Sequence, residues 1–271
     1  MVSTSTRIAR LFERTQSENR AAFICYLTAG DPTPALTPAL VAALERGGAD
    51  LIELGVPFSD PIADGPVIQR GTERALKAGT SVRTVLEIAR KIRQNSEIPL
   101  LLFTYLNPVL RYGLDRLAHD AYEAGIDGVL LTDLSVEEAG QYVDAMRQQG
   151  LDTVFLAAPT SSPERLRLVA QYSTGFVYLV SRTGVTGEQS TLSTSMTPLI
   201  DAMRAHTKAP LAVGFGISTP EQAHTVAQVA DGVVIGSAVV RLVAEHAASP
   251  DRLTAELEQY ARRIREALHK A

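Results

Sequence analysis

The chain has 271 residues, of which 45% are hydrophobic and 21% charged, and its net charge is −4 at pH 7. These values are typical of a soluble globular protein, and the negative charge argues against binding to a nucleic-acid backbone. The single cysteine, Cys25, cannot form an internal disulfide and fits a reducing compartment. The first residues contain no apolar stretch of signal-peptide length, and no run approaches the length of a membrane span. We therefore expect a cytoplasmic protein with neither nucleic acid nor membrane as a partner.

Short apolar runs alternate with helical patterns along the whole chain. Residues 4–16 place Ile8, Leu11 and Phe12 at helical spacing and predict an N-terminal helix. Helical periodicity recurs at 81–93, and residues 253–268 predict a C-terminal helix. Eight runs of strand length, rich in branched or aromatic residues, lie at 23–27, 51–54, 100–103, 128–131, 153–157, 176–180, 211–215 and 232–235.

The apolar runs are nearly continuous rather than alternating, which is typical of a parallel sheet covered on both faces. Eight such strands separated by helices over roughly 250 residues predict a (β/α)8 TIM barrel. We expect one barrel domain at 1–271, with an extra helix at each end. The rival fold is a doubly wound open sheet, which usually has fewer strands and a Gly-x-Gly-x-x-Gly turn after the first. Here the first run is followed by TAGDP at 28–32, which favours the barrel.

Polar residues at the C-terminal ends of barrel strands are the candidates for function, because active sites form at that face. The histidines fall within or beside predicted helices, away from strand ends, so we expect neither a histidine catalyst nor a metal site. No lysine is placed to form a Schiff base. Carboxylates and tyrosines remain for proton transfer. The polar residues on the functional side are Asp31, Glu53, Asp60, Asp64, Tyr105, Asn107, Asp133, Tyr178, Arg182, Thr186 and Ser237.

The stretch LIELGVPFSDPIADGP at 51–66 concentrates acids around one predicted strand. Glu53 lies within the apolar run, where an ionised acid is costly unless it is paired or catalytic. It is therefore the best candidate for a general acid–base, although a structural ion pair is the alternative. Asp64 fits either a second site acid or a turn before a glycine. Asp60, between Ser59 and Pro61, fits a loop brace or a contact residue better than a catalyst.

Glycine loops after the last two strands suggest a phosphate site. GFGIS at 214–218 follows the seventh run, and GSA at 236–238 follows the eighth and begins a helix. Glycines let backbone amides approach an anion, and a helix N-terminus adds partial positive charge. In TIM barrels a phosphate commonly binds between these two loops. A third glycine-containing loop, SRTGVTG at 181–187, follows the sixth run and suggests a lid.

These motifs together resemble the alpha subunit of tryptophan synthase. The stretch at 51–66 matches that family nearly end to end, supported by YLTAGDP at 26–32, YLNP at 105–108, YLVSRTGVTG at 178–187 and GFGIS at 214–218. The resemblance implies a lyase of tryptophan biosynthesis that splits indole-3-glycerol phosphate into indole and glyceraldehyde 3-phosphate. It also implies that Glu53 shuttles protons, that Asp64 holds the indole N–H, and that Tyr178 lies beside Glu53.

The same resemblance implies further binding roles. The phosphate would be held by Gly187, Gly214, Gly216, Gly236 and Ser237, and Phe215 would form a wall of the indole pocket. The chain itself would need no cofactor. Its partner would be a beta subunit that carries pyridoxal phosphate, in an alpha2–beta2 complex. The loops at 57–61 and 105–109 would contact that partner, through Pro57, Phe58, Asp60 and Asn107.

Three other interpretations remain at this point. A different sugar-phosphate isomerase or epimerase would share the barrel and the phosphate site. A silent phosphate-binding subunit would have the same loops, although the presence of both Glu53 and Asp64 argues against it. A stand-alone indole lyase would share the whole site, and the sequence does not separate it from a subunit of a complex.

Overall fold

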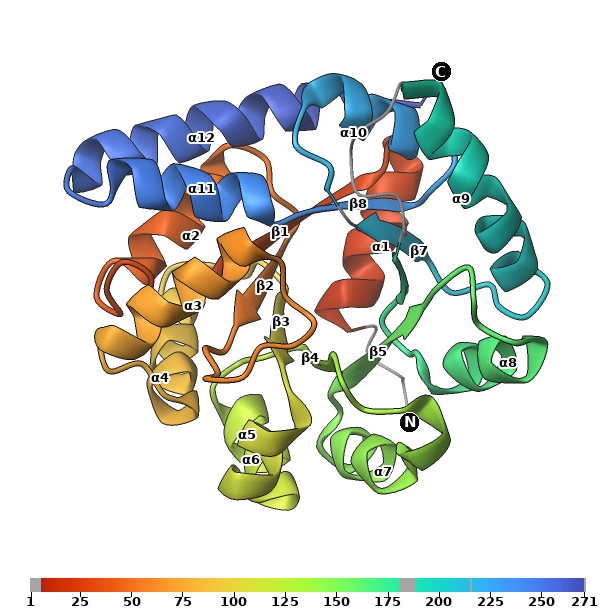
Figure 1. Cartoon of the computed structure of the whole chain (residues 1–271), viewed down its shortest axis with the longest axis horizontal. Coiled ribbons are helices and arrows are strands. Elements are labelled where there is room, and N and C mark those ends of the chain that lie inside the picture. Colours follow the sequence, from red (N-terminus) through yellow and green to blue (C-terminus); the bar gives the residue numbers. More distant parts are fainter. Residues whose placement is uncertain (1–5, 181–188, 215, 271) are drawn as a thin grey trace.

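The computed structural model describes residues 6–180, 189–214 and 216–270, and these form a closed barrel of eight parallel strands surrounded by helices (Figure 1). Each strand pairs with the next, and β8 pairs with β1, so the predicted (β/α)8 fold is confirmed. The strands are β1 (Ala22–Thr28), β2 (Leu51–Gly55), β3 (Leu100–Thr104), β4 (Gly128–Leu131), β5 (Asp152–Ala157), β6 (Val177–Val180), β7 (Leu211–Gly214) and β8 (Gly232–Ile235).

The helices at both ends of the chain agree with the predicted pattern, and the segment between β2 and β4 contains helices that the sequence did not indicate. The N-terminal and C-terminal helices are present, and the connection from β2 to β3 contains two helices where the sequence indicated only 81–93. The helices are α1 (Arg7–Ser17), α2 (Thr37–Arg46), α3 (Pro66–Lys77), α4 (Val82–Arg93), α5 (Leu106–Tyr112), α6 (Leu114–Glu123), the 3₁₀ turn η1 (Val136–Glu138), α7 (Gly140–Gln149), α8 (Pro163–Tyr172), α9 (Gln189–Arg204), α10 (Pro220–Ala227), α11 (Ser237–His246) and α12 (Pro250–Glu266).

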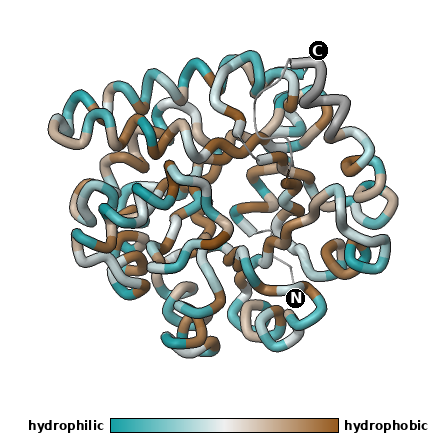
Figure 2. The backbone as a smooth tube through the Cα atoms, viewed as in Figure 1, coloured by the Kyte–Doolittle hydropathy of each residue, from teal (hydrophilic) through white to brown (hydrophobic). Residues whose placement is uncertain are grey.

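Two hydrophobic layers explain why the strands are apolar along their whole length. On β1, Phe23, Cys25 and Leu27 belong to the large outer core beneath the helices. The alternate residues Ala22 and Ile24 belong to the core inside the barrel, because successive strand side chains point to opposite faces. Figure 2 shows mainly hydrophobic residues along the strands, whereas hydrophobic and hydrophilic residues alternate along the outer helices. No helix within the described part of the chain is both long and apolar enough to cross a membrane.

Helix α1 fills the N-terminal end of the barrel. Its side chains Ile8, Leu11 and Phe12 are buried in the inner core, and the Phe12 ring lies 5.8 Å from that of Phe176 on the floor of the barrel. In Figure 1 this helix lies behind the ring of strands, near its centre. The residues of α1 therefore complete the inner core, and the N-terminal end of the barrel is packed rather than hollow.

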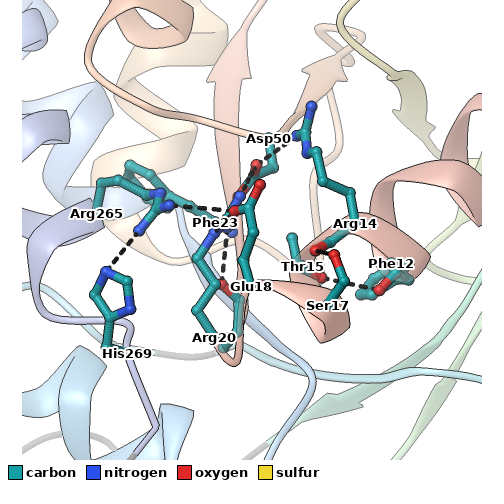
Figure 3. Close-up of polar contacts among 11 residues, drawn as sticks. Phe12, Arg14, Thr15, Ser17, Glu18, Arg20, Phe23, Asp50, Arg265 and His269 are labelled. Carbon is teal, nitrogen blue, oxygen red and sulfur yellow. Dashed lines mark hydrogen bonds and ion pairs between the residues drawn. The ribbon is translucent and has the colours of Figure 1, made fainter.

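A buried ion pair joins α1 to the first two strands (Figure 3). Asp50, just before β2, accepts hydrogen bonds from Arg20 at 2.6 and 2.9 Å and from Arg14 of α1 at 2.7 Å. It also accepts the backbone N–H of Phe23 at 2.8 Å. Asp50 and Arg20 are each only 4% exposed, so the carboxylate replaces its lost hydration with four donor contacts.

Contacts equivalent to the one between Asp50 and Phe23 recur around the N-terminal face of the barrel. Before each even-numbered strand, a side-chain oxygen accepts a backbone N–H from the start of the preceding odd-numbered strand. Two of the other three acceptors are aspartates that also bind arginine, and the third is a threonine hydroxyl. The remaining pairs are Leu100 N–H to Asp127, Thr153 N–H to Thr174 and Leu211 N–H to Asp231.

We expect Asp50→Ala to destabilise the fold by about 3–5 kcal/mol, the usual cost of removing one member of a buried ion pair. The substitution removes the acceptor of the Phe23 amide and of two Arg20 N–H groups, and it leaves Arg20 with only Glu18 and the Ala21 carbonyl. Urea unfolding followed by circular dichroism measures the effect. Glu256→Ala is the matched control, since Glu256 forms a 3.7 Å ion pair with Arg252 on the exposed face of α12. An Asp50→Ala midpoint equal to that of the control would contradict this role.

Candidate active site

A cavity of about 440 Å³ lies at the C-terminal end of the barrel, as the fold rule predicts. Two carboxylates, two tyrosines and a set of glycines and apolar side chains surround it. None of the described lining residues is a histidine or a lysine. The described residues that line it are Tyr26, Glu53, Ala63, Asp64, Gly65, Ile68, Phe103, Thr132, Leu156, Ala158, Tyr178, Val180, Gly216, Val234, Gly236 and Ser237.

Glu53 lies on the floor of this cavity. It is in the middle of β2, with Tyr26 of β1 and Leu101 of β3 as its neighbours in the strand register. Its side chain is fully buried, and neither carboxylate oxygen has a hydrogen-bond partner among the described residues. Burial without a partner disfavours the charged form and raises the pKa of Glu53 to about 8. At neutral pH this side chain is therefore mainly a neutral acid that can donate a proton.

Asp64 comes from the loop between β2 and α3 and is half-buried at the side of the cavity. Burial raises the pKa of Asp64 to about 6, and a hydrogen bond with Tyr105 opposes the increase. At neutral pH Asp64 is thus mainly ionised while Glu53 is mainly protonated. The two carboxyl groups that the sequence singled out are brought to one cavity, with pKa values that differ by environment.

Tyr105 supports the loop that carries Asp64. Its hydroxyl accepts the backbone N–H of Ala63 at 3.1 Å, and its ring lies 5.4 Å from that of Phe58. Tyr105 is 3% exposed and directly precedes α5, so it connects the loop to the end of β3. The sequence placed Tyr105 on the functional side, but its contact with Ala63 depends on the fold.

Tyr178 and Tyr26 face the cavity from opposite parts of the barrel. The hydroxyl of Tyr178 on β6 lies over Gly214 of β7, where a Cβ atom would be only 2.2 Å away. Gly214 does not line the cavity among the described residues, and the structure gives it the role of making room for Tyr178. Tyr26 and Phe103 also line the cavity, and sequence reasoning missed both because aromatic residues within apolar runs are indistinguishable from core.

Part of each predicted phosphate loop lines the cavity. Gly216, with a φ of 74°, lines it, and Gly236 and Ser237 line it at the start of α11. The N-terminal backbone N–H groups of this ten-residue helix have no acceptors within the helix and favour an anion. Phe215, Gly187 and the predicted lid residues Arg182 and Thr186 lie outside the described residues.

Several other residues on the functional side have structural or surface positions. Asp31 is 1% exposed and accepts two hydrogen bonds from Arg74, at 2.8 and 2.7 Å. Asp133 accepts the Leu106 N–H at 2.7 Å and so holds the start of α5. Pro57 is buried and Phe58 half-buried, whereas Asp60 and Asn107 are exposed. Within the described part of the chain, no cluster of His, Cys, Asp and Glu side chains has the arrangement of a metal site.

A closed (β/α)8 barrel with two carboxyl groups of different pKa beside a glycine-lined helix N-terminus defines a barrel enzyme of the acid–base type. Comparison with known proteins identifies which one. Residues 12–269 match the family model "Tryptophan synthase alpha chain". The chain belongs to the tryptophan synthase alpha chain family. This is a family of lyases whose reaction is the cleavage of indole-3-glycerol phosphate in tryptophan biosynthesis.

Individual relatives agree with the family model over nearly the whole chain. The tryptophan synthase alpha chain of Solibacter usitatus is 68% identical over 96% of this chain and 97% of its own length. That of Geotalea uraniireducens is 51% identical over 89% of this chain and 90% of its own length. Among solved structures, tryptophan synthase subunit alpha from Legionella pneumophila has a TM-score of 0.89 at 38% identity, covering 98% of this chain and all of that chain.

The pKa of Glu53 predicts how stability depends on pH. The folded pKa of about 8 exceeds the ordinary value of 4.5. Proton binding by Glu53 therefore stabilises the folded state fully below pH 4.5, and this contribution is lost as the pH rises through 8. At about 1.4 kcal/mol per pKa unit, the loss amounts to a few kcal/mol. Glu53→Gln cannot ionise and should therefore lose less stability than wild type between pH 5 and 9. Urea midpoints measured across this range test it, and parallel curves would contradict the pKa.

Proposed function

We propose that this chain cleaves indole-3-glycerol phosphate in the cavity at the C-terminal end of the barrel, with Glu53 as the general acid–base. The supporting observation is the fully buried Glu53 side chain, whose two oxygens have no partner in the described residues. A buried polar group without a hydrogen bond is destabilising and calls for a functional explanation. A substrate that supplies the missing hydrogen bond explains why the carboxyl group is retained there.

The protons balance through one carboxyl group. Protonated Glu53 transfers its proton to carbon 3 of the indole ring, and the resulting carboxylate takes the proton of the glycerol hydroxyl on the adjoining carbon. The bond between that carbon and the ring then breaks, its electrons return to the ring, and the products are indole and the aldehyde of glyceraldehyde 3-phosphate. Glu53 is protonated again at the end. A pKa of about 8 suits both steps near neutral pH.

Asp64 is assigned to the indole N–H. Ring protonation places positive charge on the indole nitrogen, and an ionised carboxylate that accepts its N–H stabilises that charge. The pKa of Asp64, about 6, keeps this group ionised at neutral pH while Glu53 remains protonated. Tyr178 is assigned a position beside the substrate, since it lines the same cavity.

The phosphate is assigned to the backbone amides of Gly216, Gly236 and Ser237 at the start of α11. The family resemblance adds Gly187 and Gly214 to this set and Phe215 to the indole pocket. Of these, Gly214 contributes by leaving space for the Tyr178 hydroxyl next to the strand. Phosphate at this end of the cavity and the indole near Asp64 would place the scissile bond over Glu53.

The partner is a beta subunit, because alpha chains of this family act with one in the tryptophan synthase complex. An alpha2–beta2 assembly in the cytoplasm, with pyridoxal phosphate held by the beta subunit, follows from the resemblance. The contact surface is assigned to the loops at 57–61 and 105–109. Directly after these loops, two large apolar side chains, Ile62 and Leu110, are 83% and 61% exposed. Exposed apolar side chains on neighbouring segments support a docking surface.

Glu53→Gln should lower the rate of cleavage by roughly 10²- to 10⁴-fold, because it removes the proton donor and keeps the side-chain volume. Indole release from indole-3-glycerol phosphate measures the rate. Glu87→Gln, on the exposed face of α4, is the matched control and should retain full activity. A folded Glu53→Gln protein with nearly wild-type turnover would exclude Glu53 as the acid–base.

Asp60→Ala should reduce activation by the beta subunit more than it reduces the basal rate. Asp60 is exposed on the loop that carries Asp64, so it is assigned to the partner and Asp64 to the chemistry. A partner that binds the productive loop geometry increases its population. Both rates are measured in one indole assay, without and with saturating beta subunit. Equal fractional losses would show that Asp60 does not transmit the effect, and a chain fully active alone would indicate a stand-alone lyase.

A further inference from the structure

Tyr26 is the immediate neighbour of Glu53 inside the barrel. The two residues are register partners on β1 and β2, and both side chains line the cavity. The Tyr26 ring is held by an edge-on contact with Phe103, with ring centroids 5.2 Å apart and planes at 78°. Only 7% of the residue is exposed. A tyrosine packed this firmly has its hydroxyl at a defined point of the cavity.

The hydroxyl of Tyr26 lies over Gly55, where a Cβ atom would be 2.2 Å from the hydroxyl oxygen. Gly55 is the next residue after Glu53 on the inward face of β2, because side chains alternate along a strand. Two residues of parallel strand span about 6.6 Å. The Tyr26 hydroxyl therefore occupies the inward position directly beyond the Glu53 carboxyl group. Both groups line the same cavity at successive inward positions, so one ligand can contact both of them.

The hydrogen bonds on each side of this gap are incomplete. The Thr28 hydroxyl donates to the Tyr26 oxygen at 3.4 Å, and the Tyr26 proton has no acceptor among the described residues. The Glu53 oxygens likewise have no donor there. The Tyr26 O–H group and the Glu53 carboxyl group thus face one cavity, each without this hydrogen-bond partner, and they do not bind each other. A hydroxyl group of a ligand between them satisfies both.

Tyr178 occupies a corresponding position on the other side of the barrel. It is the register partner of Ala212, and its hydroxyl lies 2.2 Å from the Cβ position of Gly214, two residues further along β7. Tyr26, Glu53 and Gly55 repeat this arrangement on β1 and β2. Only the Tyr26 pair has an acid in place of the alanine. The structure therefore supports a chemical role for Tyr26 in addition to packing.

We propose that the Tyr26 hydroxyl donates a hydrogen bond to the substrate oxygen from which Glu53 takes a proton. The inference rests on the proposed role of Glu53. As the O–H proton moves to the Glu53 carboxylate and the carbon–carbon bond breaks, this oxygen becomes the carbonyl oxygen of the aldehyde. Tyr26 stabilises the negative charge that develops on the oxygen and keeps its own proton. Burial and the nearby Asp64 and Glu53 carboxylates raise the pKa of Tyr26, so it remains a donor at the working pH.

Tyr26→Phe removes the hydroxyl and keeps the ring contact with Phe103. We expect kcat for indole-3-glycerol phosphate to fall roughly 10- to 100-fold with KM changed less than about twofold, the result for a donor that acts mainly in the transition state. The pH midpoint of kcat/KM should not move, because Tyr26 does not bind Glu53 in the free chain. Tyr142→Phe is the matched control: its buried hydroxyl donates to the Val129 carbonyl at 2.6 Å, away from the cavity. The control should keep its kcat.

A substrate analogue that has the phosphate but lacks the hydroxyl next to the ring provides a second measurement. It should bind wild type and Tyr26→Phe with equal affinity. Weaker binding of this analogue to Tyr26→Phe, or a loss that appears in KM alone, would overturn the proposal, as would wild-type kcat in a folded variant. Glu53→Gln in the same assay distinguishes a failure of the role of Tyr26 from a failure of the proposed role of Glu53. Inactive Glu53→Gln with fully active Tyr26→Phe overturns only the role of Tyr26, whereas active Glu53→Gln overturns both.

Discussion

Parallel strands in a closed barrel leave backbone N–H groups at their N-terminal ends that no neighbouring strand accepts, and buried amides must be paired. Asp50, Asp127 and Asp231 accept three of these amides and bind arginines at the same time. Two of the arginines, Arg7 and Arg14, belong to α1, so the same pairs hold that helix in the barrel. With α1 packed into the N-terminal end, the barrel is solid below Glu53, and the described cavity with both acids lies at the opposite end.

The strands could be predicted from the sequence because burial on both faces produces continuous apolar runs, a signal that needs no tertiary information. Helices α3 and α5 could not. The buried face of α3 is Ile68, Gly71, Thr72 and Ala75, three small residues and one large one, which gives little periodicity. Helix α5 has only seven residues and follows β3 directly. Both are positioned by packing against the barrel rather than by their own patterns.

The site likewise contains residues that could be predicted from the sequence and residues that could not. Glu53 was predictable because an acid inside an apolar strand is a local anomaly. Asp64 was left open between two roles, since its proximity to Glu53 depends on how the loop folds back over the cavity. Tyr26 was not identified at all, because an aromatic residue in a buried strand fits the core equally well. Its significance comes from the strand register, which sets it beside Glu53 and places Gly55 under its hydroxyl. Register is a property of the closed sheet and cannot be read from a single strand.

Two buried carboxyl groups, Asp50 at the N-terminal end of the barrel and Glu53 on the floor of the cavity, differ in their hydrogen bonds. Asp50 is 4% exposed and accepts from two arginines and a backbone amide, so folding alone satisfies it. Glu53 is fully buried three residues further along, in β2, and has no donor in the described structure, so burial raises its pKa instead. Had an arginine stood beside Glu53, the carboxyl group would be ionised at neutral pH and unable to give a proton to the ring. The arginines that bind Asp50 and Asp127 thus lie at the N-terminal face, whereas burial alone sets the pKa of Glu53 and its hydrogen bonds are left to the substrate. The unpaired burial of Glu53 lowers the stability of the fold, and the same burial keeps the group protonated and able to react.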